Sequence, residues 1–170
     1  MRWLRLSLFA QAILALYFQV IQWLPLGSWN YQPEHSGLTP FSNLPLSVLA
    51  VQGRLTAQAA LLVIGCVLPF AIFWFAYFRG LRWLMWMQVG FYSVWMAVEM
   101  SWWVLYAIGR SDSEVQRYQR IFGLSTQLLP SFGRHLPPDG VHLVLHILLA
   151  AVLVSAVVGL LKPSSQAPSE

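Results

Sequence analysis

The sequence contains few charged residues. Ten Lys and Arg and six Asp and Glu make up 9% of its 170 residues, whereas soluble domains carry about 25%. No charged side chain occurs in the segments 6–33, 55–78 and 140–161, and Glu99 is the only one in 83–109. We therefore expect neither a soluble enzyme nor a nucleic-acid-binding protein. The net charge of +4 is assigned to the flanks of membrane segments.

Cysteine is also scarce, because Cys66 is the only one in the chain. A single cysteine excludes an intramolecular disulfide and a Cys-x-x-Cys redox pair, and with them the small membrane thiol oxidoreductases. We interpret Cys66 as a small apolar side chain inside a helix. The sequence has no recognisable catalytic motif, so it gives no support to an enzymatic activity.

Apolar residues are abundant and make up 58% of the chain. A bilayer core requires about 20 apolar residues per helix. The sequence therefore predicts an all-α membrane protein with one domain, 1–162, that is an antiparallel bundle of four transmembrane helices. The expected limits of these helices are 3–24, 55–78, 83–108 and 140–161. The segment 163–170 is rich in Ser and Pro and predicts a disordered tail.

Local signals define several ends and connections. Residues 79–82 form a very short connection, so the second and third helices should be antiparallel neighbours. The pattern Ser111-x-x-Glu114 is a capping box, which predicts a short amphipathic surface helix between the third and fourth spans. Asp139 is placed to cap the fourth helix. Three small residues on that helix should let another helix approach closely: Ala151, Ser155 and Gly159.

The basic residues suggest an orientation for this bundle. One side of the membrane should hold Arg2, Arg5, Arg79, Arg82 and Lys162. The other side should hold equally many, so the count alone does not decide the orientation: Arg54, Arg110, Arg117, Arg120 and Arg134. We expect this side to be cytoplasmic, together with the N- and C-termini, because positive charge acts most strongly beside a first helix and in a short loop. The expected location is the inner, cytoplasmic membrane of a bacterium. The first apolar segment is expected to be a retained helix, because it continues past Trp23, contains three glutamines and offers no small-x-small cleavage site before Pro25.

The sequence is rich in tryptophan, with nine residues, and most lie near predicted helix ends, where indole rings prefer the headgroup level. Trp95 lies in the middle of the third span. At 100° per residue it belongs to one stripe of that helix: Gln88, Tyr92, Trp95, Glu99 and Trp102. Four of these residues, with two glutamines from the first and second spans, could line a pocket for a quinone, a carotenoid or a lipid: Tyr92, Trp95, Glu99, Trp102, Gln22 and Gln58. The alternative is that the aromatic residues only pack between helices.

Histidines provide a second hypothesis for a site. His142 and His146 are four residues apart on the fourth helix, so they share a face. Together with Glu99 and His35 they would form a metal-binding set in the outer leaflet, since imidazole and carboxylate suit zinc, iron, copper or manganese. The alternative is a pair of hydrogen-bonded structural histidines. Haem is disfavoured, because two axial imidazoles must approach from opposite faces.

Three functions are compatible with these features. The first is an accessory or scaffold membrane protein that packs against another membrane protein. The second is a metal-binding or apolar-ligand-binding redox site built on Glu99, His142 and His146, in which Glu99 accepts a proton. The third is a small proton-coupled transporter that uses Glu99, because ionisable residues inside a membrane span mark functional sites. A protonated Glu99 that only hydrogen-bonds to a glutamine is the structural alternative.

Overall fold

The computed structural model describes residues 2–23, 26–29 and 57–162. This part of the chain is all helical and contains no strand. Its elements are α1 (Arg2–Trp23), the 3-10 helix η1 (Gly27–Trp29), α3 (Ala57–Arg79), α4 (Arg82–Glu99), α5 (Ser101–Ile108), α6 (Asp112–Phe122) and α7 (Gly140–Leu161). His35 and the expected tail at 163–170 lie outside the described residues.

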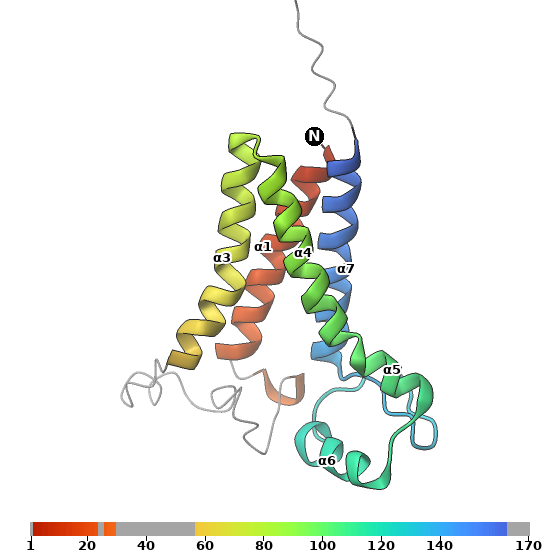
Figure 1. Cartoon of the computed structure of the whole chain (residues 1–170). Coiled ribbons are helices and arrows are strands. Elements are labelled where there is room, and N and C mark those ends of the chain that lie inside the picture. The colour runs from red at the N-terminus through yellow and green to blue at the C-terminus, as the bar shows by residue number, and fades with distance from the viewer. Residues whose placement is uncertain (1, 24–25, 30–56, 163–170) are drawn as a thin grey trace, which may run out of the picture.

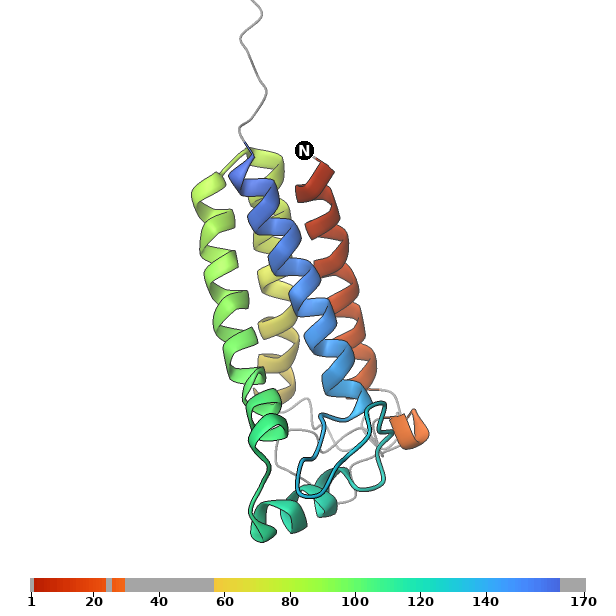
Figure 2. The same ribbon diagram turned by 90° about the vertical axis from the view of Figure 1, so that its right-hand side faces the viewer.

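The long helices α1, α3, α4 and α7 lie side by side in both ribbon views (Figures 1 and 2). α1 packs against α3 and α7, and α4 packs against the same two helices. The turn between α3 and α4 contains Gly80 with a φ of 67°, a left-handed conformation that glycine adopts without strain. As the short connection predicts, α3 and α4 are antiparallel neighbours.

In the described residues, two helical segments are long and apolar enough to cross a membrane: Arg2–Ile21 and Gly140–Leu161. The segment Val67–Arg79 of α3 is apolar but shorter. α3 runs through Pro69, which is buried.

The long helices pack through two apolar clusters. The first cluster joins α1, α4 and α7 through Ala10, Leu14, Tyr92, Leu145, Leu149 and Val152. The second joins α3, α4 and α7 through Phe73, Ala76, Met85, Val89, Ala156 and Leu160. α4 and α7 each contribute to both clusters, whereas α1 and α3 each contribute buried residues to one.

A buried chain of hydrogen bonds links α4, α1 and α7. The Tyr92 hydroxyl donates to Gln11 Oε1 at 3.2 Å, and Gln11 Nε2 donates to Ser7 Oγ at 3.1 Å. The Ser7 hydroxyl donates in turn to the carbonyl of Val152 at 3.4 Å. None of these three side chains is more than 2% exposed. The polar groups therefore satisfy one another inside the helices.

One long element differs from the expected helix over 83–108. The structure divides this segment at Met100 into α4 and α5, and α5 turns away from the axis of α4 (Figure 1). The segment contains no proline, so the cause is not a missing backbone N–H. The break instead coincides with a hydrogen bond from His146 of α7 to the backbone carbonyl of Glu99.

Residues 101–139, which we call the cap, lie at one end of the long helices (Figures 1 and 2). The predicted amphipathic helix is confirmed as α6, and the Ser111 backbone N–H donates to Glu114 Oε2 at 3.2 Å. The Tyr118 hydroxyl of α6 donates to the carbonyl of Pro137 at 2.7 Å. Backbone bonds of 2.7 Å connect the Thr126 N–H to Ser28 of η1 and the Gly140 N–H of α7 to Thr126. The cap is therefore bonded to both α7 and η1.

Candidate functional site

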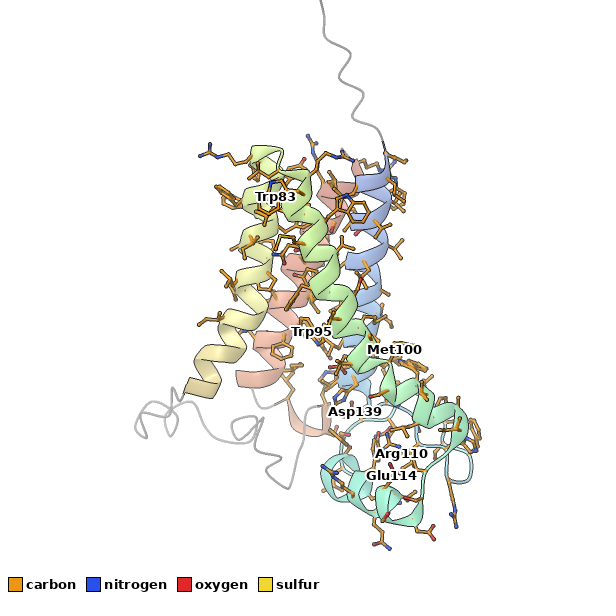
Figure 3. All side chains as sticks on the ribbon, viewed as in Figure 1. Trp83, Trp95, Met100, Arg110, Glu114 and Asp139 are labelled. Carbon is orange, nitrogen blue, oxygen red and sulfur yellow. The ribbon has the colours of Figure 1, made fainter. Side chains whose placement is uncertain are left out.

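A buried histidine and a partly buried carboxylate meet where α4 ends against α7. His146 Nε2 donates to the backbone carbonyl of Glu99 at 3.0 Å and lies 3.8 Å from Glu99 Oε2. Trp95 Nε1 donates to Glu99 Oε1 at 3.3 Å. The Trp103 ring meets the His146 ring edge to face, with centroids 5.8 Å apart. We call these four residues, Trp95, Glu99, Trp103 and His146, the Glu99 site; Figure 3 labels Trp95 and Met100, which flank Glu99 along the chain.

The break at Met100 explains why this carbonyl is available to His146. In a regular α-helix the Trp103 N–H would bond to the carbonyl of Glu99, four residues earlier. Here the Trp103 N–H donates to the carbonyl of Met100 at 3.0 Å, three residues earlier. The carbonyl of Glu99 accepts a hydrogen bond from His146 instead. Insertion of a side chain into the helical hydrogen-bond ladder is a recognised cause of a kink. The histidine of α7 therefore determines where α4 ends.

The protonation of His146 follows from its partners. A carbonyl oxygen only accepts, so Nε2 carries the proton, and in the neutral ring Nδ1 is an acceptor. The His146 side chain is 4% exposed, and its Nδ1 has no hydrogen-bond partner among the described residues. A buried acceptor without a partner costs about 1–3 kcal/mol. The ring is thus prepared to accept a proton or a donor group of a ligand, with the Glu99 carboxylate beside it.

The aromatic stripe of α4 takes part in packing. Tyr92 is 2% exposed and stacks on Trp95, with ring centroids 6.4 Å apart and an interplanar angle of 16°. Phe18 of α1 meets Trp95 edge to face at 5.7 Å. Tyr92 and Trp95 both belong to the apolar cluster that joins α1, α4 and α7. Of the two interpretations of the stripe, helix packing has these observed contacts in its favour.

His142 has different neighbours from His146. Its backbone N–H and its Nδ1 both donate to Asp139 Oδ1, at 3.0 Å and 2.6 Å, which confirms Asp139 as the cap of α7. The His142 ring also meets Phe122 of α6 edge to face at 5.3 Å. The side chain therefore joins α7 to the cap, whereas His146 joins α7 to α4.

The predicted metal set is not brought together in the described part of the chain. Within those residues, no group of three or more His, Cys, Asp and Glu side chains is placed to hold a metal ion. His35, the fourth predicted ligand, lies outside them. The chemistry that the observed groups support is transfer or binding of a proton.

Three predicted lining residues belong to described helices, but their side chains lie outside the described set: Gln22 of α1, Gln58 of α3 and Trp102 of α5.

Sequence reasoning missed Trp103. A regular helix places Trp102, three residues after Glu99, on the stripe, and Trp103 is also a neighbour of Glu99 at a spacing of four. The spacing of four residues between Glu99 and Trp103 could have identified Trp103 as a member of the site.

Comparisons of this chain with models of known protein families, with curated proteins and with solved structures found no match. Function is therefore inferred from the chain's own residues: the distribution of apolar side chains over the long helices, the surface of the cap, and the Glu99 site.

Proposed function

We propose that the chain is an integral membrane protein whose helices α1, α3, α4 and α7 cross the bilayer as an antiparallel four-helix bundle. The distribution of side chains on α1 carries this proposal. Ser7 and Gln11 are 0% and 1% exposed, whereas Phe9 and Leu16 on the same helix are 63% and 65% exposed. In water the opposite distribution would be expected, with polar side chains on the surface and apolar side chains inside. Exposed apolar surface is unfavourable in water, and a buried polar group is unfavourable unless it is hydrogen-bonded.

The exposed apolar residues extend over all four helices of the proposed bundle. They include Leu16 of α1, Phe78 of α3, Val94 and Val98 of α4, and Val154 of α7. The helix lengths are also suitable: α1 and α7 each have 22 residues, which corresponds to about 33 Å, close to the hydrocarbon thickness of about 30 Å. α3 has 23 residues and α4 has 18.

Within the membrane we propose that the protein acts as an accessory or scaffold subunit for another membrane protein. The surface of the cap supports this role. Leu124, Leu128 and Phe132 are 62%, 50% and 55% exposed, although the cap is connected to the bundle by hydrogen bonds and projects beyond its end. Exposed apolar side chains on a region outside the bundle are typical of a protein interface.

Cysteine labelling tests the membrane topology. In a Cys66→Ala background, Lys162→Cys and Gln116→Cys each place one thiol at opposite ends of the bundle. We expect alkaline carbonate to leave both proteins in the membrane pellet. An impermeant maleimide should label Gln116→Cys in intact cells and Lys162→Cys only after lysis. Release by carbonate, or labelling of both positions from one side, would refute the proposed bundle topology.

Photo-crosslinking tests the scaffold role. A photoreactive residue at Leu128 or Phe132 should give one discrete protein adduct in native membranes. The matched control is the same residue at Phe78, which is 66% exposed but lies on the side of the bundle and should contact lipid. Adducts of the same protein from Phe78 and Phe132, or no protein adduct from the cap, would contradict a specific partner there.

A second candidate function is proton-coupled binding at the Glu99 site. The partnerless Nδ1 of His146 and the distance of 3.8 Å between Nε2 and Glu99 Oε2 favour it. Protonation of Nδ1 would create an ion pair with Glu99 at the point where α5 leaves the bundle. We expect nitrogen NMR of ring-labelled histidine to show that Nε2 of His146 carries a proton and donates a hydrogen bond, and that Glu99→Gln changes the nitrogen shifts of this ring. An unprotonated Nε2, or unchanged shifts in Glu99→Gln, would refute the coupling.

A further inference from the structure

The end of the bundle opposite the cap carries only positive charge among the described residues. Its basic residues are Arg2, Arg5, Arg79, Arg82 and Lys162. The described carboxylates are Glu99, Asp112, Glu114 and Asp139, which lie at the other end of α4, in the cap and at the start of α7. Nitrogen-tipped side chains gather at this end in Figure 3, where Trp83 is labelled.

A hollow of about 500 Å³ lies at this end, on the outer side of α1. It is lined by Arg2, Trp3, Arg5, Leu6 and Phe9. The spacing from Arg2 to Phe9 places Arg2, Arg5, Leu6 and Phe9 on one face of α1, with the cations near the helix end and the apolar residues further along. Leu6 and Phe9 are 47% and 63% exposed. The lining is therefore cationic at one end and apolar at the other.

Neighbouring helices position the cationic part of the hollow. Arg5 Nε donates to the Tyr77 hydroxyl of α3 at 3.2 Å, which fixes the guanidinium across the α1–α3 contact. Lys162 Nζ lies 5.6 Å from the centre of the Trp3 ring, so a third cation borders the hollow. Neither arginine has a carboxylate partner within the described chain, where the ion pairs involve Arg134, His142 and His146.

We propose that this hollow binds one anionic phospholipid. Guanidinium groups bind phosphate oxygens through paired hydrogen bonds, and Arg2 and Arg5 lie where a headgroup phosphate would meet the helix end. The first part of an acyl chain would then lie along Leu6 and Phe9, in the same direction as the helix. The site rests on the proposed membrane insertion, because only a bilayer presents phosphate and hydrocarbon in this order.

Native mass spectrometry of the full chain, released from nanodiscs of equal phosphatidylglycerol and phosphatidylcholine, tests the proposal. The wild type should retain one phosphatidylglycerol. Each basic residue near a membrane surface contributes about fivefold to binding of anionic lipid, so Arg2→Gln/Arg5→Gln should weaken retention about 30-fold. The matched control, Arg79→Gln/Arg82→Gln, removes the same charge from the same end but leaves the lining intact, and should retain the lipid.

Three outcomes would overturn the lipid site. Equal retention of the two lipids removes the requirement for negative charge. An equal loss of phosphatidylglycerol in both double variants would show that the lipid responds only to the total positive charge at this end of the bundle. Displacement of the lipid by millimolar inorganic phosphate would indicate a site for free phosphate. Phosphate makes no contact with Leu6 and Phe9, so it should not compete with a lipid that is also bound through its acyl chain. Arg2→Gln alone, a change at an exposed helix end, repeats the test with little risk to folding. Failure of the carbonate test would refute membrane insertion itself and is distinct from these outcomes.

Discussion

Gly159 of α7 lies in close contact with Leu4 of α1, and adding one methyl group there tests that contact. A Cβ at this position would lie 2.7 Å from Leu4 Cδ2, 2.8 Å from Leu4 Cγ and 3.0 Å from the Leu4 backbone nitrogen. The side-chain atoms can rotate away, but the backbone nitrogen moves only with α1. Overpacking of this kind costs about 1–3 kcal/mol. Gly159→Ala should therefore weaken the α1–α7 interface.

Gly90 of α4 provides the matched control, because a Cβ there would meet no atom within 4 Å. Replacing glycine by alanine inside a helix stabilises it by about 1 kcal/mol, so Gly90→Ala should increase the free energy of unfolding. We expect Gly159→Ala to be less stable than Gly90→Ala by about 1–3 kcal/mol. Unfolding in mixed micelles of dodecyl sulfate and a mild detergent measures both values.

The Leu4 side chain supplies the two closest atoms, so its removal should relieve part of the strain. In the double variant Leu4→Ala/Gly159→Ala, the two changes should destabilise the protein by less than the sum of the single changes. Equal stability of Gly159→Ala and Gly90→Ala, together with additive behaviour in the double variant, would refute the close approach of α1 and α7.

Three further predictions concern buried hydrogen bonds. Tyr92→Phe leaves Gln11 Oε1 buried without its donor and should lower the free energy of unfolding by about 1–3 kcal/mol in the same assay; no change would contradict the buried chain. Burial raises the pKa of Tyr118 to about 12. Because the folded protein retains this proton more strongly than the unfolded chain, stability should be constant below pH about 10 and should fall as pH rises toward about 12. Absorbance titration at alkaline pH, with Tyr118→Phe as control, measures this, and a phenol that ionises near pH 10 would refute it. Asp139→Ala removes the cap of α7 and should cost about 1 kcal/mol in thermal denaturation, whereas Asp139→Asn should retain most of it.

Local patterns were sufficient to predict several elements. The capping box gave the start of α6, and Asp139 gave the start of α7. The short connection gave the antiparallel pair α3 and α4. These predictions succeeded because each depends on residues a few positions apart.

The division at Met100 depends on His146, which is 47 residues away from Glu99 in the sequence. No periodicity reports such a contact, and an apolar segment without proline looks continuous. The same limit applies to the histidine pair. Their spacing places His142 and His146 on one face, but Asp139 binds one ring and the end of α4 binds the other.

The most extensive helix packing joins α1 to α7, whose sequences are separated by more than a hundred residues. In the proposed membrane topology, α1 would enter the bilayer well before α7 is synthesised. Until then Ser7 lacks the Val152 carbonyl, and Gln11 lacks the Tyr92 hydroxyl until α4 follows. Ser7 and Gln11 still have each other, at 3.1 Å and one helical turn apart. Under the proposed membrane insertion, this local pair would keep the polar groups of α1 partly hydrogen-bonded in the bilayer until α7 packs against it.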